Sequence, residues 1–276
     1  MTDWKKRLAI ISDEADDSFR DAVQFCLPLG IRNYEIRKLG GGRFPDVSDE
    51  AIQEVIDTVA EYDLNLIGVS PGFFKHDLAE ATTERTFHDG LPRAITLMHK
   101  LGMTRMTLFT FKRGSDPNAP IPGQIYDYLG RAIEICRGEG IEVLLENAAS
   151  IWSNTGANLA TIAATLGLRV VWDPANAAAS GELAYPDGYA EVRDLIAHVH
   201  FKNWTRADGF VAINEGVADL TGQVAALKAD GYDGHFCLEP HQWADRHNAV
   251  RANTAQLLNL LQPLGGGEKV CRDHTK

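Results

Sequence analysis

Short apolar runs alternate with segments of helical periodicity along most of the chain. Eight runs have the length and composition of buried strands: residues 8–12, 33–37, 64–69, 103–109, 143–146, 170–173, 196–200 and 235–239. Between residues 52 and 60, apolar side chains recur every three or four positions, which predicts an amphipathic helix. Ser48 precedes this segment as an N-cap, followed by two acidic residues in the first turn.

Five further segments show the same helical spacing, over residues 91–101, 125–136, 159–166, 220–227 and 250–261. A glycine separates most of these helices from the next strand, as expected at a helix C-terminus. Alternating strands and helices predict a parallel sheet, and eight such units predict an α/β fold with a single (β/α)8 TIM barrel. No GxGxxG or GxxxxGK[ST] motif follows a strand, which argues against an open nucleotide-binding sheet.

The barrel is expected to span residues 1–264 as one domain. Residues 265–276 begin with three glycines and have no apolar period, so we expect a flexible C-terminal tail there. A chain of 276 residues with 45% hydrophobic residues can bury a core of this size.

The net charge of -11 argues against non-specific binding to nucleic acid or to an anionic membrane. The four cysteines show no CxxC spacing, which is typical of reduced thiols in a cytoplasmic protein. No apolar run is long enough for a signal-peptide core or a membrane span. We therefore expect a cytoplasmic protein with a small-molecule partner, and the sequence leaves homo-oligomerisation open.

Each of the last four predicted strands ends in a residue that can bind a metal ion: Glu146, Asp173, His200 and Glu239. The strand ends of a barrel meet at one rim, where active sites are built. One acidic residue in such a place is more commonly a helix cap or an ion-pair partner, but four in succession indicate a shared site. Three carboxylates and one imidazole favour one divalent ion, Mn²⁺, Mg²⁺ or Co²⁺, and also accept Zn²⁺.

Several motifs occur in a characteristic order: SDE at 12–14, YEIR at 34–37, SPGFFK at 70–75, LLEN at 144–147, WDPAN at 172–176, HVHFKN at 198–203 and LEPH at 238–241. With these motifs, nearly the whole chain resembles the xylose-isomerase-like TIM-barrel superfamily, the sugar isomerases and epimerases related in fold to endonuclease IV. The resemblance implies metal binding by Glu146, Asp173, His200 and Glu239, the same residues that the strand pattern selects.

The chain departs from the ketose 3-epimerases of this superfamily at one position. Those enzymes have a histidine three residues after the metal-binding aspartate, where this chain has Asn176. His241, two residues after Glu239 and on the same side of an extended strand, is either a replacement substrate contact or a residue that orients a ligand. The expected substrate-binding residues are Lys75, Asn176, Lys202 and His241.

Other polar residues near strand ends are weaker candidates for substrate contacts: Glu35, Arg37, Lys112 and Arg113. Trp152, Trp204 and Trp243 follow predicted strands and either wall a sugar pocket or pack loops onto the barrel.

The sequence favours a metal-dependent isomerase or epimerase of a keto sugar, a keto-polyol or a related hydroxy-carbonyl compound, acting through a metal-stabilised enediolate. Glu146 and Glu239 are the predicted acid and base. A lyase or dehydratase that expels a β-leaving group from a keto sugar or a 3-keto-glycoside would use the same residues, and a non-catalytic sugar-binding barrel is a more remote alternative. A nuclease of the endonuclease IV type would need more histidine ligands and a basic surface.

Overall fold

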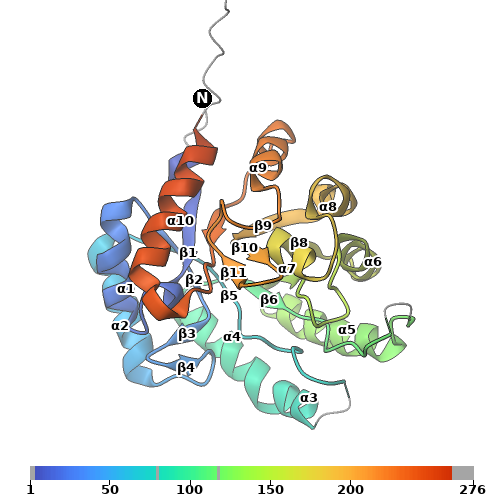
Figure 1. Cartoon of the computed structure of the whole chain (residues 1–276). Helices are drawn as coiled ribbons and strands as arrows, with labels where there is room; N and C mark the ends of the chain where they lie inside the picture. The colour runs from blue at the N-terminus through green and yellow to red at the C-terminus, as the bar shows by residue number, and fades with distance from the viewer. Residues whose placement is uncertain (1–3, 79–80, 117–118, 263–276) are drawn as a thin grey trace, which may run out of the picture.

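Eight parallel strands close into a barrel with helices around it in the computed structural model of the chain (Figure 1). The structure describes residues 4–78, 81–116 and 119–262. The barrel strands are β1 (Leu8–Ile11), β2 (Asn33–Ile36), β5 (Asn65–Val69), β6 (Arg105–Leu108), β7 (Glu142–Glu146), β8 (Arg169–Trp172), β9 (Ile196–Phe201) and β12 (Phe236–Leu238). They pair in the order β1–β12–β9–β8–β7–β6–β5–β2, and β2 returns to β1. This arrangement confirms the predicted (β/α)8 barrel.

Ten helices are described: α1 (Phe19–Cys26), α2 (Asp49–Tyr62), α3 (Thr82–Arg85), α4 (Leu91–Lys100), α5 (Gly123–Gly138), α6 (Gly156–Leu166), α7 (Pro174–Ala179), α8 (Tyr189–Val192), α9 (Leu220–Ala229) and α10 (Arg246–Leu261). The six predicted helices correspond to α2, α4, α5, α6, α9 and α10. The Ser48 side chain accepts a hydrogen bond from the Ala51 N–H, so it caps α2 as expected. The sequence did not predict α1, α3, α7 and α8, because a helix of four to eight residues shows too few turns of periodicity.

Two short antiparallel hairpins follow barrel strands and were not predicted. The first pairs β3 (Lys38–Leu39) with β4 (Gly42–Arg43) after β2, and the second pairs β10 (Asn203–Thr205) with β11 (Gly209–Val211) after β9. Both lie beyond the carboxyl ends of their strands and therefore add to the rim where the site was expected.

Along the strands, side chains of the main apolar core alternate with side chains that face the inside of the barrel. In β9, Val199 and Phe201 belong to the main apolar core, while His198 and His200 contact Glu35 of β2 across the barrel. Small apolar clusters, such as Leu144 with Val171 and Ala197, fill other parts of the barrel. The barrel is a packed core whose carboxyl end carries buried polar side chains.

The predicted C-terminal tail, residues 265–276, lies outside the described residues, and so does the domain boundary at 264. Within the described chain, Cys26, Cys136 and Cys237 are buried free thiols. None of the described helices combines the length and apolar character needed to cross a membrane.

Candidate active site

The structure brings four side chains from the last four barrel strands together at the carboxyl end of the barrel. Ligand atoms of Glu146, Asp173, His200 and Glu239 lie within 4.8 Å of one another, and all four residues are buried. The Nδ1 atom of His200 lies 3.2 Å from Glu146 Oε1 and 3.5 Å from Glu239 Oε2. We call these four residues the upper cluster.

The Lys202 ammonium group lies between two carboxylates of the upper cluster. Its Nζ donates hydrogen bonds to Asp173 Oδ2 and Glu239 Oε2, and the side chain is fully buried. Burial alone would lower the pKa of Lys202, but the facing carboxylates of Asp173 and Glu239 raise it above its usual value. Lys202 was predicted to contact substrate; the structure places its charge against two predicted metal ligands. The upper cluster therefore already holds a cation, which shows that its donors suit positive charge.

Burial and mutual repulsion act on the carboxylates of the upper cluster. Burial raises the pKa of Asp173, and the nearby charges of Glu239 and Glu146 add to this effect. For Glu239 burial acts in the same direction, but Lys202 and His241 outweigh it and hold the pKa well below its usual range. Buried carboxylates this close to one another require cationic partners to remain ionised together.

Asp173 is held rigidly at the start of α7. Its Oδ1 accepts hydrogen bonds from the Ala175 and Asn176 N–H groups at 2.9 and 3.0 Å, which makes it the N-cap of α7. The Asn147 side chain bonds both backbone groups of Asp173 at 2.8 Å. The Asn176 amide group, a predicted substrate contact, donates to Asp173 Oδ2 and to the Asn147 carbonyl oxygen. Asn147 was not predicted as a site residue, although it belongs to the LLEN motif.

A second group of side chains lies deeper in the barrel and shares His200 with the upper cluster. We call Glu35, His198, His200 and Cys237 the lower cluster; their ligand atoms also lie within 4.8 Å of one another. Glu35 Oε2 lies 3.0 Å from His198 Nε2 and 2.9 Å from His200 Nε2. A proton on Nε2 of His200 therefore bonds to Glu35, and Nδ1 faces the upper cluster.

The electrostatics of the lower cluster favour an ion pair between Glu35 and His200. Burial disfavours both charges, but His200 and His198 hold the pKa of Glu35 well below its usual range. Glu35 and Glu146 likewise raise the pKa of His200 well above its usual value despite burial. For His198 burial prevails and lowers the pKa, so this ring is neutral.

Arg37 connects the upper cluster to the end of β1. Its guanidinium donates to both oxygens of Asp13, to Glu14 Oε1 at 2.6 Å and to Glu239 Oε1 at 2.9 Å. Its Nη1 also lies 2.9 Å from His241 Nε2. Asp13 and Glu14 were not predicted as site residues. Their signal in the sequence is that they directly follow a buried strand, as the residues of the upper cluster do.

Strained backbone gathers around the rim. His241, Phe74 and Phe111 have φ values of 54°, 62° and 60°, a left-handed conformation that residues other than glycine rarely adopt. The His241 N–H donates to Glu14 Oε2 at 2.8 Å, which holds its turn in place. Such strain collects at functional sites, where surrounding contacts maintain it.

The three tryptophans near the rim differ in exposure. Trp152 is buried and its ring lies 5.3 Å from the Arg113 guanidinium, so it packs a loop onto the barrel. Trp204 is partly buried against the core. The Trp243 side chain is 48% exposed and its ring centroid lies 5.6 Å from that of His241. Of the three, Trp243 is the most exposed, and the Arg37 guanidinium and the Lys38 ammonium lie over its ring at 5.4 and 5.5 Å from the centroid.

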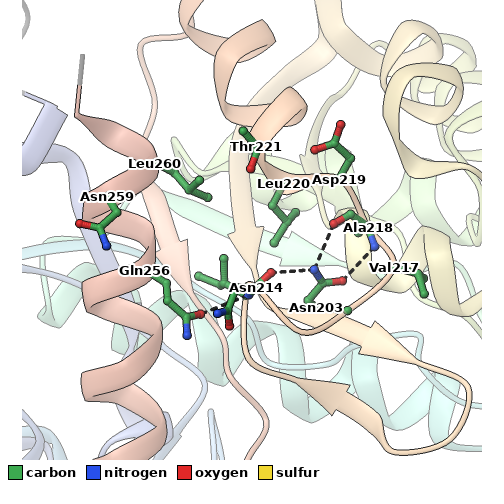
Figure 2. A pocket seen from close by; sticks show the side chains of 12 residues that line it. Asn203, Asn214, Val217, Ala218, Asp219, Leu220, Thr221, Gln256, Asn259 and Leu260 are labelled. Atoms are coloured by element: carbon green, nitrogen blue, oxygen red, sulfur yellow. Dashed lines mark hydrogen bonds between the residues drawn. The ribbon is translucent and has the colours of Figure 1, made fainter. Parts of the chain in front are cut away.

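A separate pocket lies between the loop before α9 and helix α10 (Figure 2). The Asn203 amide crosses this region: it donates to the carbonyl oxygens of Ile213 and Ala218 and accepts from the Ala218 N–H. Asp219, the one ionisable residue of the lining, caps α9 through the Gly222 N–H. These polar groups hold the loop in place. With Asp219 as its one ionisable residue, the lining lacks the convergent titratable groups of the upper cluster.

Comparison with known proteins gives one family and several similar structures. The family model described as "Xylose isomerase-like TIM barrel" matches residues 23–260. No curated protein matches the sequence significantly. The structure of the probable 3-DHS dehydratase AsbF from Bacillus anthracis has a TM-score of 0.75 at 18% identity, covering 92% of this chain and 99% of that chain.

Two other similar structures contain a bound group. The IOLI protein with a zinc atom has a TM-score of 0.75 at 14% identity, covering 92% of this chain and 97% of that chain. The D-allulose 3-epimerase from Methylomonas sp., in complex with D-allulose, has a TM-score of 0.71 at 17% identity with the same coverage of 92% and 97%. At these identities the similar structures establish the fold.

Proposed function

Because the chain belongs to the xylose isomerase-like TIM barrel family, we propose that it is a divalent-metal-dependent isomerase or epimerase of a keto sugar, a keto-polyol or a related hydroxy-carbonyl compound. The observation that carries this proposal is the convergence of Glu146 and Glu239, from strands separated by β8 and β9, on the same imidazole of His200. Two carboxylates around one buried position are the groups needed to take a proton from carbon and return it.

Glu146, Asp173, His200 and Glu239 would hold the metal ion. Their donor set suits a divalent cation, and Lys202 already places a positive charge between Asp173 and Glu239. When bound, the ion would polarise the substrate carbonyl and stabilise the negative charge that forms on its oxygen. The zinc atom in the similar IOLI structure is consistent with a divalent ion in this chain.

The chain's own residues would move the proton. One glutamate removes the proton from the carbon next to the carbonyl, and the other returns a proton to the product. Glu239 is held by Arg37, Lys202 and His241, which stabilise its ionised form and make it a weak base. Among the described residues, the Glu146 carboxylate contacts His200 and none of these cations. We therefore assign the initiating base to Glu146 and the second transfer to Glu239.

An elimination would begin with the same proton removal and then expel a β-leaving group. The similar structure of a probable dehydratase makes this the alternative outcome. Isomerisation and elimination differ in product mass, since only elimination loses water or an aglycone.

Proton exchange in D₂O tests the proposal. Purified protein with Mn²⁺, Mg²⁺ or Co²⁺ is incubated with keto sugars, keto-inositols, hydroxypyruvate and 3-keto-glycosides, and the products are examined by NMR and mass spectrometry. We expect a product that carries deuterium at the reacting carbon and is otherwise unchanged in composition. We also expect about one bound ion per chain. Asp173→Asn should lose the ion. A lighter product would establish a lyase, and the absence of exchange with every compound and metal would refute the enolisation mechanism.

A further inference from the structure

Two cations at the rim, Arg43 and Lys75, have no acidic partner. No carboxylate of the described chain lies within 4.0 Å of either. The other two basic side chains of the site do have acidic partners. Arg37 contacts Asp13, Glu14 and Glu239. Lys202 contacts Asp173 and Glu239. Arg43 is half-buried and Lys75 is exposed, so both basic groups can reach a molecule bound at the rim.

Arg43 is fixed in place by backbone groups alone. Its Nε donates to the Pro71 carbonyl oxygen and its Nη2 to the Ser70 carbonyl oxygen, both at 3.0 Å. Gly72 leaves room for this contact, since a Cβ there would lie 2.6 Å from Arg43 Nη2. The guanidinium carries five N–H donors, and the described residues provide no acceptor for those on Nη1. The Arg43 guanidinium is therefore held by two hydrogen bonds and keeps its Nη1 N–H groups available to another acceptor.

Lys75 lies in the loop after β5, which also contains the Ser70 and Pro71 carbonyl groups that bind Arg43. Its Nζ is 4.1 Å from the centroid of the Phe109 ring at the end of β6. The loop is tied to the residues after β6 by hydrogen bonds from the Phe109 and Phe111 N–H groups to the Phe73 and Phe74 carbonyl oxygens. The Lys75 side chain is open to solvent, but surrounding protein lowers its pKa, as expected for a residue that lines a concave rim.

Both cations lie at the rim that carries the upper cluster. Arg43 bonds the carbonyl oxygens of Ser70 and Pro71, and the Lys75 N–H donates to the Gly72 carbonyl oxygen in the same loop. The Lys75 ammonium overlies Phe109, which follows Leu108 of β6, and Leu108 pairs with Leu145, the residue before Glu146 of β7. The charges of Glu146 and Glu239 also act on both cations, against the effect of burial on their pKa values. The two positive groups therefore lie near each other and near the proposed acid and base. Each carries N–H donors without an acidic partner, so one anionic group bound between them could bond to both.

We propose that Arg43 and Lys75 form an oxyanion subsite, so that the substrate is a hydroxy-carbonyl compound carrying a carboxylate or a phosphate. This inference rests on the proposed function, because it places the anionic group beside the carbon that Glu146 and Glu239 would act on. Arg43 supplies planar N–H donors and Lys75 a point charge, a combination that suits either oxyanion. A neutral sugar would leave both charges uncompensated.

Three ligands with one carbon skeleton test the subsite without turnover: glycerol, glycerate and glycerol 3-phosphate. Their binding to the Mg²⁺-loaded protein is measured by calorimetry. We expect saturable binding of at least one anion, about ten- to a hundredfold tighter than glycerol, and the same factor lost in Lys75→Met. Glycerate and glycerol 3-phosphate distinguish a carboxylate from a phosphate.

Lys75→Arg keeps the charge and should keep the preference. Lys100→Met is the matched control, because it removes the same charge at the end of α4, at the opposite end of the barrel from the site. Arg43→Met should lose binding as Lys75→Met does; if it folds poorly by circular dichroism, Lys75→Met decides alone. Equal binding of glycerol and both anions, or an anion preference unchanged in Lys75→Met, would overturn the subsite.

Proton exchange separates this inference from the proposed function. Exchange with neutral keto sugars together with no anion preference would retain the isomerase and refute the subsite. Anion binding that depends on Lys75 without any exchange would retain the subsite and refute the isomerase.

Discussion

The upper and lower clusters share His200 and contain similar residue types, but their charges differ. The upper cluster combines three carboxylates with one imidazole, whereas the lower cluster combines one carboxylate, two imidazoles and a thiol. In the lower cluster, Glu35 bonds both rings, and its negative charge is matched by a protonated His200. In the upper cluster the carboxylates outnumber the imidazole, and Lys202 and Arg37 supply the remaining positive charge.

This difference makes the upper cluster the better candidate for the proposed metal ion. A thiol binds metal as a thiolate, but burial and the nearby Glu35 raise the pKa of Cys237 well above its usual value, so the sulfur keeps its proton. In the lower cluster, Glu35 Oε2 holds the His200 ring, while Glu35 Oε1 and His198 Nδ1 have no hydrogen-bond partner among the described residues. Histidines that bind metals commonly donate their second N–H to a carboxylate in this way.

The largest expected effect is on catalysis. Glu146→Gln and Glu239→Gln each remove one half of the proton transfer and should slow deuterium exchange by about 10²- to 10⁴-fold. Cys237→Ser, in the lower cluster, should leave the rate nearly unchanged. Exchange rates are measured by NMR with a substrate found in the panel. A full rate in either glutamine variant would show that its glutamate is not part of the transfer.

Removal of Lys202 should separate metal-free stability from metal binding. Lys202→Met leaves Asp173 and Glu239 buried without their ammonium partner, which should lower the free energy of unfolding in EDTA by about 3–5 kcal/mol. The same change removes a competitor for the two carboxylates, so Mn²⁺ should raise the melting temperature of the variant more than that of the wild type. An equal rise in both proteins would mean that Lys202 does not compete with the ion.

A smaller effect is expected where the lower cluster supports the upper one. Glu35→Gln removes the charge that holds the His200 ring and should weaken metal affinity by about 10- to 100-fold without changing the number of ions bound. Cys237→Ser is the matched control and should leave affinity and stoichiometry unchanged. If the wild type binds two ions and Cys237→Ser binds one, the lower cluster also holds a metal ion, and the proposed difference between the two clusters is wrong.

pH should act in opposite directions on the metal-free and metal-bound protein. Burial opposes the charge on His200, but Glu35 and Glu146 raise its pKa well above 6.5. A raised folded-state pKa stabilises the metal-free protein below the unfolded value, and this stability is lost as pH rises through the folded value. Metal binding must displace the proton, so affinity should rise over the same range.

Urea unfolding in EDTA and metal titration, each as a function of pH, measure these two trends. His200→Ala should flatten the stability trend. If wild type and His200→Ala lose stability in parallel as pH rises, His200 is not the titrating group.

Much of the fold was predictable from local pattern, because a barrel repeats one local unit. All eight strands were located within one or two residues at each end, and Ser48 was correctly identified as the cap of α2. The short helices α1, α3, α7 and α8 and the two hairpins were missed, since a few residues carry too little periodicity to identify them.

The sequence by itself determined which side chains stand at strand ends, and hence the convergence of Glu146, Asp173, His200 and Glu239, because parallel strands in a closed barrel place their carboxyl ends on one rim. Only the tertiary structure decided what each side chain touches there. Arg37 meets Glu239 across 202 residues of sequence, and Arg43 bonds the loop after β5 from a hairpin that no pattern predicted. Such contacts depend on side-chain reach and on the neighbours that folding supplies, and no local period encodes either.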